Sequence, residues 1–291
     1  MKSIYFIILL SFATACELVV PIDLPDQEPK LVLNGFLEAD SGATVFLSRS
    51  YGMYEEFDID PVPGGQVTIA ENQGSAVPMF QDRDDSLRFD LDALTIQPGN
   101  TYTVEASAPG YETVRGVTTV PQRITFDTVE VDLGARRDRD SVLFDVWTLH
   151  LTDPPGEENY YFLRVYLDTD IENYLICFET LDPVLADLDV LNNGNDVANL
   201  CEGRFNDVIF NGTTYELQVF TEAFYRQQPD ATIEFELLHL DQAAYNYLLS
   251  SERQFNTEGN PFAEPAIVFN NIENGFGIIG SVTSTTYRVE L

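Results

Sequence analysis

Short runs of alternating apolar and polar residues dominate the chain and predict β-strands. Between residues 101 and 108 the even positions are apolar and the odd positions are Thr, Thr, Glu and Ser, which is typical of a half-buried strand. Turn signals containing Pro and Gly separate such runs, as a β-sandwich requires. We predict strands over 31–37, 43–48, 66–71, 87–91, 101–108 and 113–120. These make residues 30–121 an Ig-like β-sandwich domain.

Longer and more aromatic strands follow Pro121 and predict a second, larger antiparallel β domain over residues 122–291. The expected strands are 124–133, 141–151, 160–168, 174–179, 205–210, 214–221 and 232–240. Glycines at 275, 277 and 280 predict a final strand that begins with a tight backbone approach and closes at 287–291. The fold class is therefore all-β.

One short helix is predicted over residues 242–255, with Asp241 as its N-cap. It carries an apolar stripe that is expected to cover one sheet. The stripe consists of Ala244, Tyr247, Leu248, Ser251 and Phe255.

The N-terminus carries an export signal. The apolar run from Ile4 to Ala15 is shorter than the roughly 20 residues that a membrane-spanning helix needs, so residues 1–15 are a signal peptide. The small residues before Cys16 resemble a bacterial lipobox, in which this cysteine receives lipid and becomes the mature N-terminus. Ala13 stands where a lipobox usually has Leu, Val or Ile, so a plainly secreted protein cut near Ala15 is the alternative. Residues 16–29, with three prolines, form a tether.

Cys177 and Cys201 are left as a pair if Cys16 carries lipid, because the chain has 3 cysteines. In an oxidising compartment such a pair favours a disulfide, and two buried thiols are the alternative. The bridge would enclose a polar loop from Asp182 to Glu202.

The charge balance excludes nucleic acid as a partner. Asp and Glu total 48 against 15 Lys and Arg, which gives a formal charge of −33 that phosphate backbones and anionic headgroups repel. Attachment to the membrane therefore depends on the N-terminal lipid. Acid-rich, lysine-poor composition also resembles adaptation to salt.

A calcium loop is the rival explanation for part of this acidity. The densest candidates are Asp187, Asp189, Asn192, Asn193, Asn195 and Asp196. Their spacing does not fit an EF-hand, which needs a central glycine and a closing glutamate. A solvated loop is expected, and the calcium question stays open.

No catalytic residue, metal site or cofactor is predicted. The chain has two histidines, His150 and His239, and lacks a Gly-x-Ser-x-Gly elbow, a His-Glu-x-x-His motif and a phosphate-binding glycine loop. His239 shares the phase of an apolar strand face, which favours a satisfied core or rim histidine. A glycan hydrolase with paired carboxylates remains an alternative, because 48 acids make the presence of such a pair uninformative.

Trp147, Tyr160 and Tyr161 are candidates for an aromatic platform that binds glycans or peptides. Core packing is the alternative, since a β protein with 20 Phe and 14 Tyr must place most of its rings inside.

Three motifs resemble one known family. They are Cys16 followed by Pro-Ile-Asp-Leu-Pro at 21–25, Asp-Pro-Pro-Gly at 153–156 leading to Asn-Tyr-Tyr-Phe-Leu-Arg at 159–164, and Asn-Pro-Phe-Ala-Glu-Pro at 260–265 before Asn-Ile-Glu-Asn-Gly-Phe-Gly-Ile at 271–278. Together they resemble the domain of unknown function 4249 lipoproteins of Bacteroidota over most of the mature chain. The resemblance implies a periplasm- or surface-facing outer-membrane lipoprotein, often encoded beside a TonB-dependent receptor, and it supplies no catalytic residues.

These features favour a noncatalytic cell-envelope lipoprotein that binds a ligand or partner, as an accessory of a TonB-dependent transporter. Phe262 and Phe276 are the candidate apolar anchors for docking to the receptor, and a purely structural turn is the alternative. A glycan hydrolase and an adhesive surface module are the alternatives at the level of function.

The lipobox interpretation makes the first prediction. Mass spectrometry of the mature protein is expected to show an acylated Cys16 at the N-terminus, and Cys16→Ser should release the protein from membranes without detergent. An unmodified terminus in the wild type would overturn it.

Overall fold

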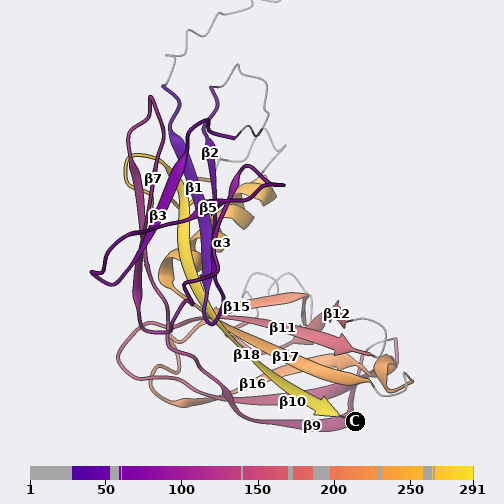
Figure 1. Ribbon diagram of the computed structural model, residues 1–291. Helices are drawn as coiled ribbons and strands as arrows, with labels where there is room; N and C mark the ends of the chain where they lie inside the picture. Colours follow the sequence, from indigo (N-terminus) through magenta and orange to yellow (C-terminus); the bar gives the residue numbers. More distant parts are fainter. Residues whose placement is uncertain are drawn as a thin grey trace, which may run out of the picture.

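The computed structural model describes residues 28–52, 59, 61–138, 140–169, 173–185, 197–227, 231–257, 264 and 266–290. The signal peptide, Cys16 and most of the tether lie outside the described residues. The all-β prediction is confirmed, because the described chain consists of strands β1–β18, one 3₁₀ turn and one α-helix (Figure 1). Among its helices, none has the length and apolar content to cross a membrane.

The N-terminal half forms a two-layered sandwich (Figure 1). Its strands are β1 (Leu31–Glu38), β2 (Ala43–Arg49), β3 (Gln66–Glu71), β4 (Val77–Pro78), β5 (Phe80–Gln81), β6 (Arg88–Leu91), β7 (Thr101–Ser107) and β8 (Val114–Thr119). One layer follows the order β1-β2-β6-β5 and the other the order β4-β3-β7-β8. Alternate side chains of both layers, such as Leu33 and Val104, are fully buried between them. The Ig-like assignment of this unit stays a prediction.

The C-terminal half forms a second sandwich with a more aromatic core. Its strands are β9 (Phe126–Arg137), β10 (Leu143–Thr152), β11 (Tyr160–Asp168), β12 (Asn173–Ile176), β13 (Phe178–Thr180), β14 (Ala198–Leu200), β15 (Glu202–Asn206), β16 (Thr214–Glu222), β17 (Thr232–Leu240) and β18 (Phe276–Glu290), with a 3₁₀ turn over Ala223–Gln227. One layer has the order β14-β13-β16-β10-β9, and the other contains β12, β11, β17 and β18, with β15 also paired to β11.

A single strand, β18, belongs to both sandwiches. Its first half, from Phe276 to Val282, pairs in parallel with β1, and its second half, from Val282 to Glu290, pairs antiparallel with β17. Figure 1 shows this strand running from beside β1 down into the lower sandwich. One nine-stranded sheet therefore spans the molecule. The prediction divided the chain into separate domains at residues 121 and 122. The structure differs from it in one respect, because the last strand of the chain pairs with β1 and completes the N-terminal sheet.

The tight backbone approach predicted for this strand is present at Gly277. This residue has φ +117°, and a Cβ there would lie 2.2 Å from the carbonyl oxygen of Leu33. Only glycine combines that conformation with so close a contact to β1.

The predicted helix is confirmed as α3 (Gln242–Thr257), and Asp241 is its N-cap, accepting a hydrogen bond of 2.8 Å from the amide of Ala244. The helix packs against β18, β11 and β17 on the outer face of the nine-stranded sheet. Its predicted apolar stripe is only partly correct: Ala244 and Leu248 pack inward with Tyr245, whereas Phe255 is 76% exposed.

The expected disulfide joins Cys177 and Cys201. The single strand predicted over 174–179 is broken at Cys177, because β12 belongs to one sheet and β13 to the other. Cys201 occupies the same place between β14 and β15. The bridge therefore ties together the two points at which neighbouring strands change sheets.

Removal of this bridge gives the second prediction. The two cysteines are 24 residues apart, so closing this loop should stabilise the protein by about 3 kcal/mol in the chain-entropy estimate. Urea unfolding of Cys177→Ser/Cys201→Ser should show this loss at unchanged pH. Equal stability of the variant and the wild type would contradict the prediction.

Candidate functional site

A cleft of about 1000 Å³ opens where the two sandwiches meet. The N-terminal sandwich contributes the end of β8 and the segment that follows it. The C-terminal sandwich contributes the β10–β11 loop, the end of β17 and the start of α3. The lining consists of Gly99, Val117–Gln122, Pro154, Pro155, Glu157–Tyr160 and His239–Ala243. A cavity of this size fits a drug-sized or short peptide ligand.

Asp241 ties together three elements beside this cleft. Its carboxylate accepts hydrogen bonds from the Ala244 amide of α3 at 2.8 Å, the Ser281 amide of β18 at 3.2 Å and the Thr118 hydroxyl of β8 at 2.5 Å. Burial raises the pKa of Asp241, and these three donors oppose that rise. The Asp241 side chain therefore has a structural role at the junction of α3, β18 and β8.

His239 forms part of the cleft wall as a neutral imidazole. It is 5% exposed, its ring stacks on Tyr161 with centroids 5.2 Å apart, and its Nδ1 lies 2.8 Å from the carbonyl oxygen of Gln122. A carbonyl can only accept, so Nδ1 carries the proton and Nε2 is an acceptor. Burial lowers the pKa of His239, against the opposing effect of nearby carboxylates that include Glu157. A satisfied rim histidine is what the sequence favours at this position.

Two loops form a hydrogen-bonded pair at one edge of the cleft. The Asn211 amide donates to the Glu157 carbonyl oxygen at 2.5 Å, and the Gly156 amide donates to the Asn211 side chain at 3.1 Å. Asn159 donates to the Glu157 carbonyl as well, at 3.2 Å. Asp207 accepts from both asparagines, at 3.2 and 2.8 Å. The backbone that presents Glu157 and Glu158 is therefore held from both sides.

One carboxylate oxygen of Asp207 in this pair of loops accepts no hydrogen bond from the described residues. The residue is fully buried, and its Oδ1 has no hydrogen-bond partner among the described residues. Burial raises the pKa of Asp207, and the nearby carboxylate of Asp153 raises it further.

Tyr160 is the predicted aromatic residue that reaches the cleft. Its hydroxyl donates to Glu158 at 2.8 Å and accepts from Gln242 at 2.9 Å, linking the β10–β11 loop to α3. Its ring packs on Tyr245 with centroids 4.7 Å apart. Only 8% of the residue is exposed, so Tyr160 is not a free aromatic platform for a ligand.

The other predicted binding residues do not join Tyr160. Trp147 and Tyr161 are completely buried: Trp147 donates to the Thr221 hydroxyl at 2.8 Å, and the hydroxyl of Tyr161 donates to Asp153. The aromatic-platform hypothesis is wrong for these two rings, which pack the core. Phe276 is 45% exposed at the start of β18, with the Lys30 ammonium 5.8 Å from its ring centroid. Phe262 lies outside the described residues.

The candidate calcium ligands between Asp187 and Asp196 lie outside the described residues. The first residue of this acidic loop, Asp182, accepts hydrogen bonds from the Tyr215 hydroxyl and the amides of Val184 and Gln218. Asp182 is thus part of the packing of the second sandwich.

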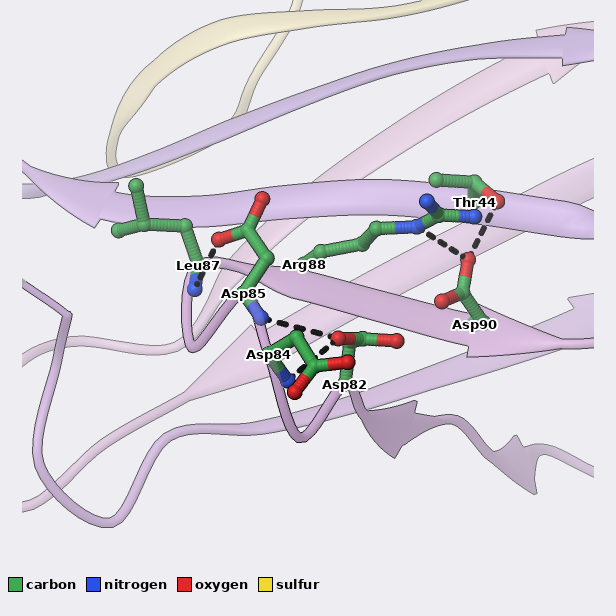
Figure 2. Close-up of polar contacts among 7 residues, drawn as sticks. All are labelled: Thr44, Asp82, Asp84, Asp85, Leu87, Arg88 and Asp90. Carbon is green, nitrogen blue, oxygen red and sulfur yellow. Dashed lines mark hydrogen bonds and ion pairs between the residues drawn. The ribbon is translucent and has the colours of Figure 1, made fainter.

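A second acidic turn precedes β6 (Figure 2). Asp82 accepts from the amides of Asp84 and Asp85 at 2.8 and 2.9 Å, and Arg88 pairs with Asp90 at 2.9 Å. Backbone donors therefore occupy the inner carboxylate oxygen, which gives the turn a structural role. Nowhere in the described chain do three or more His, Cys, Asp or Glu side chains gather as metal ligands.

Apart from Tyr160, the residues that build the cleft escaped prediction because they are distant in sequence. Asn211 and Glu157 meet only when the turn before β16 folds against the turn before β11. The one usable signal was the pair of polar turns, Asp-Pro-Pro-Gly and Asn-Gly, each placed between strongly apolar strands.

Comparisons with known proteins relate the chain to one family. The family model described as "Domain of unknown function (DUF4249)" matches residues 18–288. The search of curated proteins gives no match.

Two solved structures are weakly similar. One is a DUF4785 family protein from Legionella pneumophila subsp. pneumophila str. Philadelphia 1, with 11% identity and a TM-score of 0.24, over 69% of this chain and 48% of that chain. The other is the native conformation of E. coli alpha-2-macroglobulin, with 9% identity and a TM-score of 0.26, over 74% of this chain and 13% of that chain. The chain thus spans about half of the Legionella protein and a small part of the macroglobulin.

The role of Asp241 gives the third prediction. Asp241→Ala removes the acceptor of the Ala244 and Ser281 amides and leaves the Thr118 hydroxyl only its contact with the Ser281 hydroxyl, so the free energy of unfolding should fall by about 2–4 kcal/mol. Urea unfolding measures this change. The matched control, Asp92→Ala at an exposed position, should change stability by less than about 0.5 kcal/mol. Equal effects of the two substitutions would refute the assignment.

Proposed function

Because the chain belongs to the DUF4249 family over nearly its whole length, and that family is defined by a domain of unknown function, we propose a role from its site: a noncatalytic, lipid-anchored binding protein of the cell envelope. The cleft between the sandwiches is the observation that carries this proposal. It has the size of a ligand site, and its walls come from two sandwiches that share one strand.

The cleft is suited to binding because its parts are held in place before a ligand arrives. Asp241 joins α3, β18 and β8 on one side, and the asparagines fasten the Glu157 loop on the other. A rigid site loses little conformational entropy when it binds, which improves affinity for a given set of contacts. Catalysis has less support, since the Asp241 carboxylate already serves three structural donors.

The envelope location rests on the N-terminal sequence. Residues 1–15 have the form of a signal peptide, and Cys16 stands where a lipoprotein would be acylated. The Cys177–Cys201 disulfide is compatible with an oxidising compartment outside the cytoplasm. Lipid on Cys16, joined to the folded part by the peptide tether of residues 16–29, would keep the cleft near the outer membrane.

The partner in this proposal is a TonB-dependent outer-membrane receptor, which the protein serves as an accessory. Tethering two proteins to one membrane raises the effective concentration of each for the other, so a modest interface is sufficient. The cleft would then hold a ligand against the receptor that imports it, so that the mouth of the cleft takes part in the contact between the two proteins.

Copurification tests this function and gives the fourth prediction. The full-length protein with a C-terminal tag, extracted from membranes in mild detergent, should recover an outer-membrane receptor. Val117→Trp places a large ring in the cleft from an exposed position on β8 and should reduce recovery about tenfold, equivalent to about 1.4 kcal/mol.

Leu133→Trp is the matched control, because Leu133 is 52% exposed on β9 and lies outside the cleft. Recovery with this variant should equal that of the wild type. If no receptor is recovered under any growth condition, or if both tryptophan variants behave alike, the proposal fails.

A further inference from the structure

We infer that the cleft binds an organic cation, a ligand with an ammonium or guanidinium group on an apolar body. This inference rests on the proposed function and specifies the chemical class of the ligand. It follows from the charges, the hydrogen-bonding groups and the apolar surfaces that line the cleft.

The charges of the lining are of one sign. Among the described residues that line the cleft there is no Lys or Arg, whereas Glu157 and Glu158 are both present and exposed. The nearest basic residue in sequence, Arg123, is paired with Asp40 and the carbonyl oxygen of Ser284. The described lining therefore has no positive side chain to offset the charge of an anionic ligand. A cation, in contrast, is attracted by both glutamates.

The neutral polar groups of the cleft wall also favour a ligand that donates hydrogen bonds. The Nε2 atom of His239 is an acceptor, because Nδ1 donates to Gln122. His239 is one of the residues that line the cleft, and only 5% of it is exposed. An ammonium group donates three hydrogen bonds and accepts none, which matches such a wall.

Hydrogen bonds hold the backbone of Glu157 and the carboxylate of Glu158. The Glu157 carbonyl oxygen accepts from Asn211 and Asn159, and the Glu158 carboxylate accepts from the Tyr160 hydroxyl. The contacts to residue 157 involve only its backbone, so a cation could reach the carboxylate of this exposed residue without breaking them. A preorganised acceptor is worth more to a bound cation than a mobile surface acid.

The apolar part of the lining argues against a sugar as the ligand. Sugars are often held by a free aromatic face, whereas the ring of Tyr160 packs against Tyr245 and the ring of His239 is stacked on Tyr161. Pro121, Pro154 and Pro155 instead supply small apolar surfaces. These surfaces suit the aliphatic stem of a Lys or Arg side chain, so a basic peptide segment is the form of cation that fits best.

Titration with blocked tripeptides tests the inference and gives the fifth prediction. The purified full-length protein is titrated calorimetrically with acetylated, amidated Ala-Lys-Ala and with its Gln and Glu counterparts. An ionic strength of about 0.15 M limits attraction by distant charges to about 8 Å. The Lys peptide should bind at least about tenfold more tightly than the Gln peptide, and the Glu peptide should bind most weakly.

Glu157→Gln/Glu158→Gln should weaken binding of the Lys peptide at least about tenfold, because both charge-assisted contacts are lost. Folding should be preserved, since the contacts that hold residue 157 are made by its backbone. Glu28→Gln/Glu112→Gln changes the net charge equally at two exposed positions outside the cleft and should leave the affinity unchanged.

Absence of a preference for Lys, absence of binding by every peptide, or equal weakening in the two double variants would each overturn the inference. The proposed function fails separately, through loss of receptor copurification. Recovery of a receptor by a protein that binds no cationic peptide would leave that function in place and remove the ligand class.

Discussion

The strand β18 is the constraint on which the rest of the structure depends. Its first half hydrogen-bonds to β1 and its second half to β17, with Val282 paired in both ladders. The crossing between the sandwiches therefore contains no flexible linker on this path, and the two cores cannot rotate without breaking a continuous sheet. Gly277 allows the close approach to β1, and Gly280 allows α3 to lie against the strand, because a Cβ at Gly280 would be 2.9 Å from that of Ala244.

The cleft follows from this arrangement. Since β18 passes straight through the junction, the edges of the two sandwiches are fixed at an angle that leaves a space between β8 and the β10–β11 loop. Asp241 caps α3 at this point and also binds Ser281 of β18 and Thr118 of β8. The helix start, the shared strand and the edge of the first sandwich are thus held by one carboxylate. A site built this way is stiff, and its selectivity comes from the groups that line it.

Local patterns were sufficient to predict most strands, since a period of two appears directly in segments such as β3 and β7. They also predicted the Asp241 cap and the pairing of Cys177 with Cys201. Local sequence patterns failed where the role of a residue depends on segments that are distant in the sequence. An apolar run through Cys177 appears as one strand although the sheets change there, and nothing near Phe276 indicates that it lies beside Val32. Trp147 and Tyr161 appear as binding residues for a similar reason: composition cannot distinguish a buried ring from an exposed one.

The net charge of −33 does not by itself explain selectivity for a cation. At physiological ionic strength a charge is screened within about 8 Å, so most of the acidic surface contributes only a general attraction that every cation shares. Selectivity requires acids whose positions are fixed and whose surroundings exclude competing donors. In the β10–β11 loop, asparagines from two turns hold the backbone of Glu157, the Tyr160 hydroxyl donates to the carboxylate of Glu158, and the described lining has no basic side chain. The acidic surface would therefore act on the rate of encounter, and the loop on the lifetime of the complex.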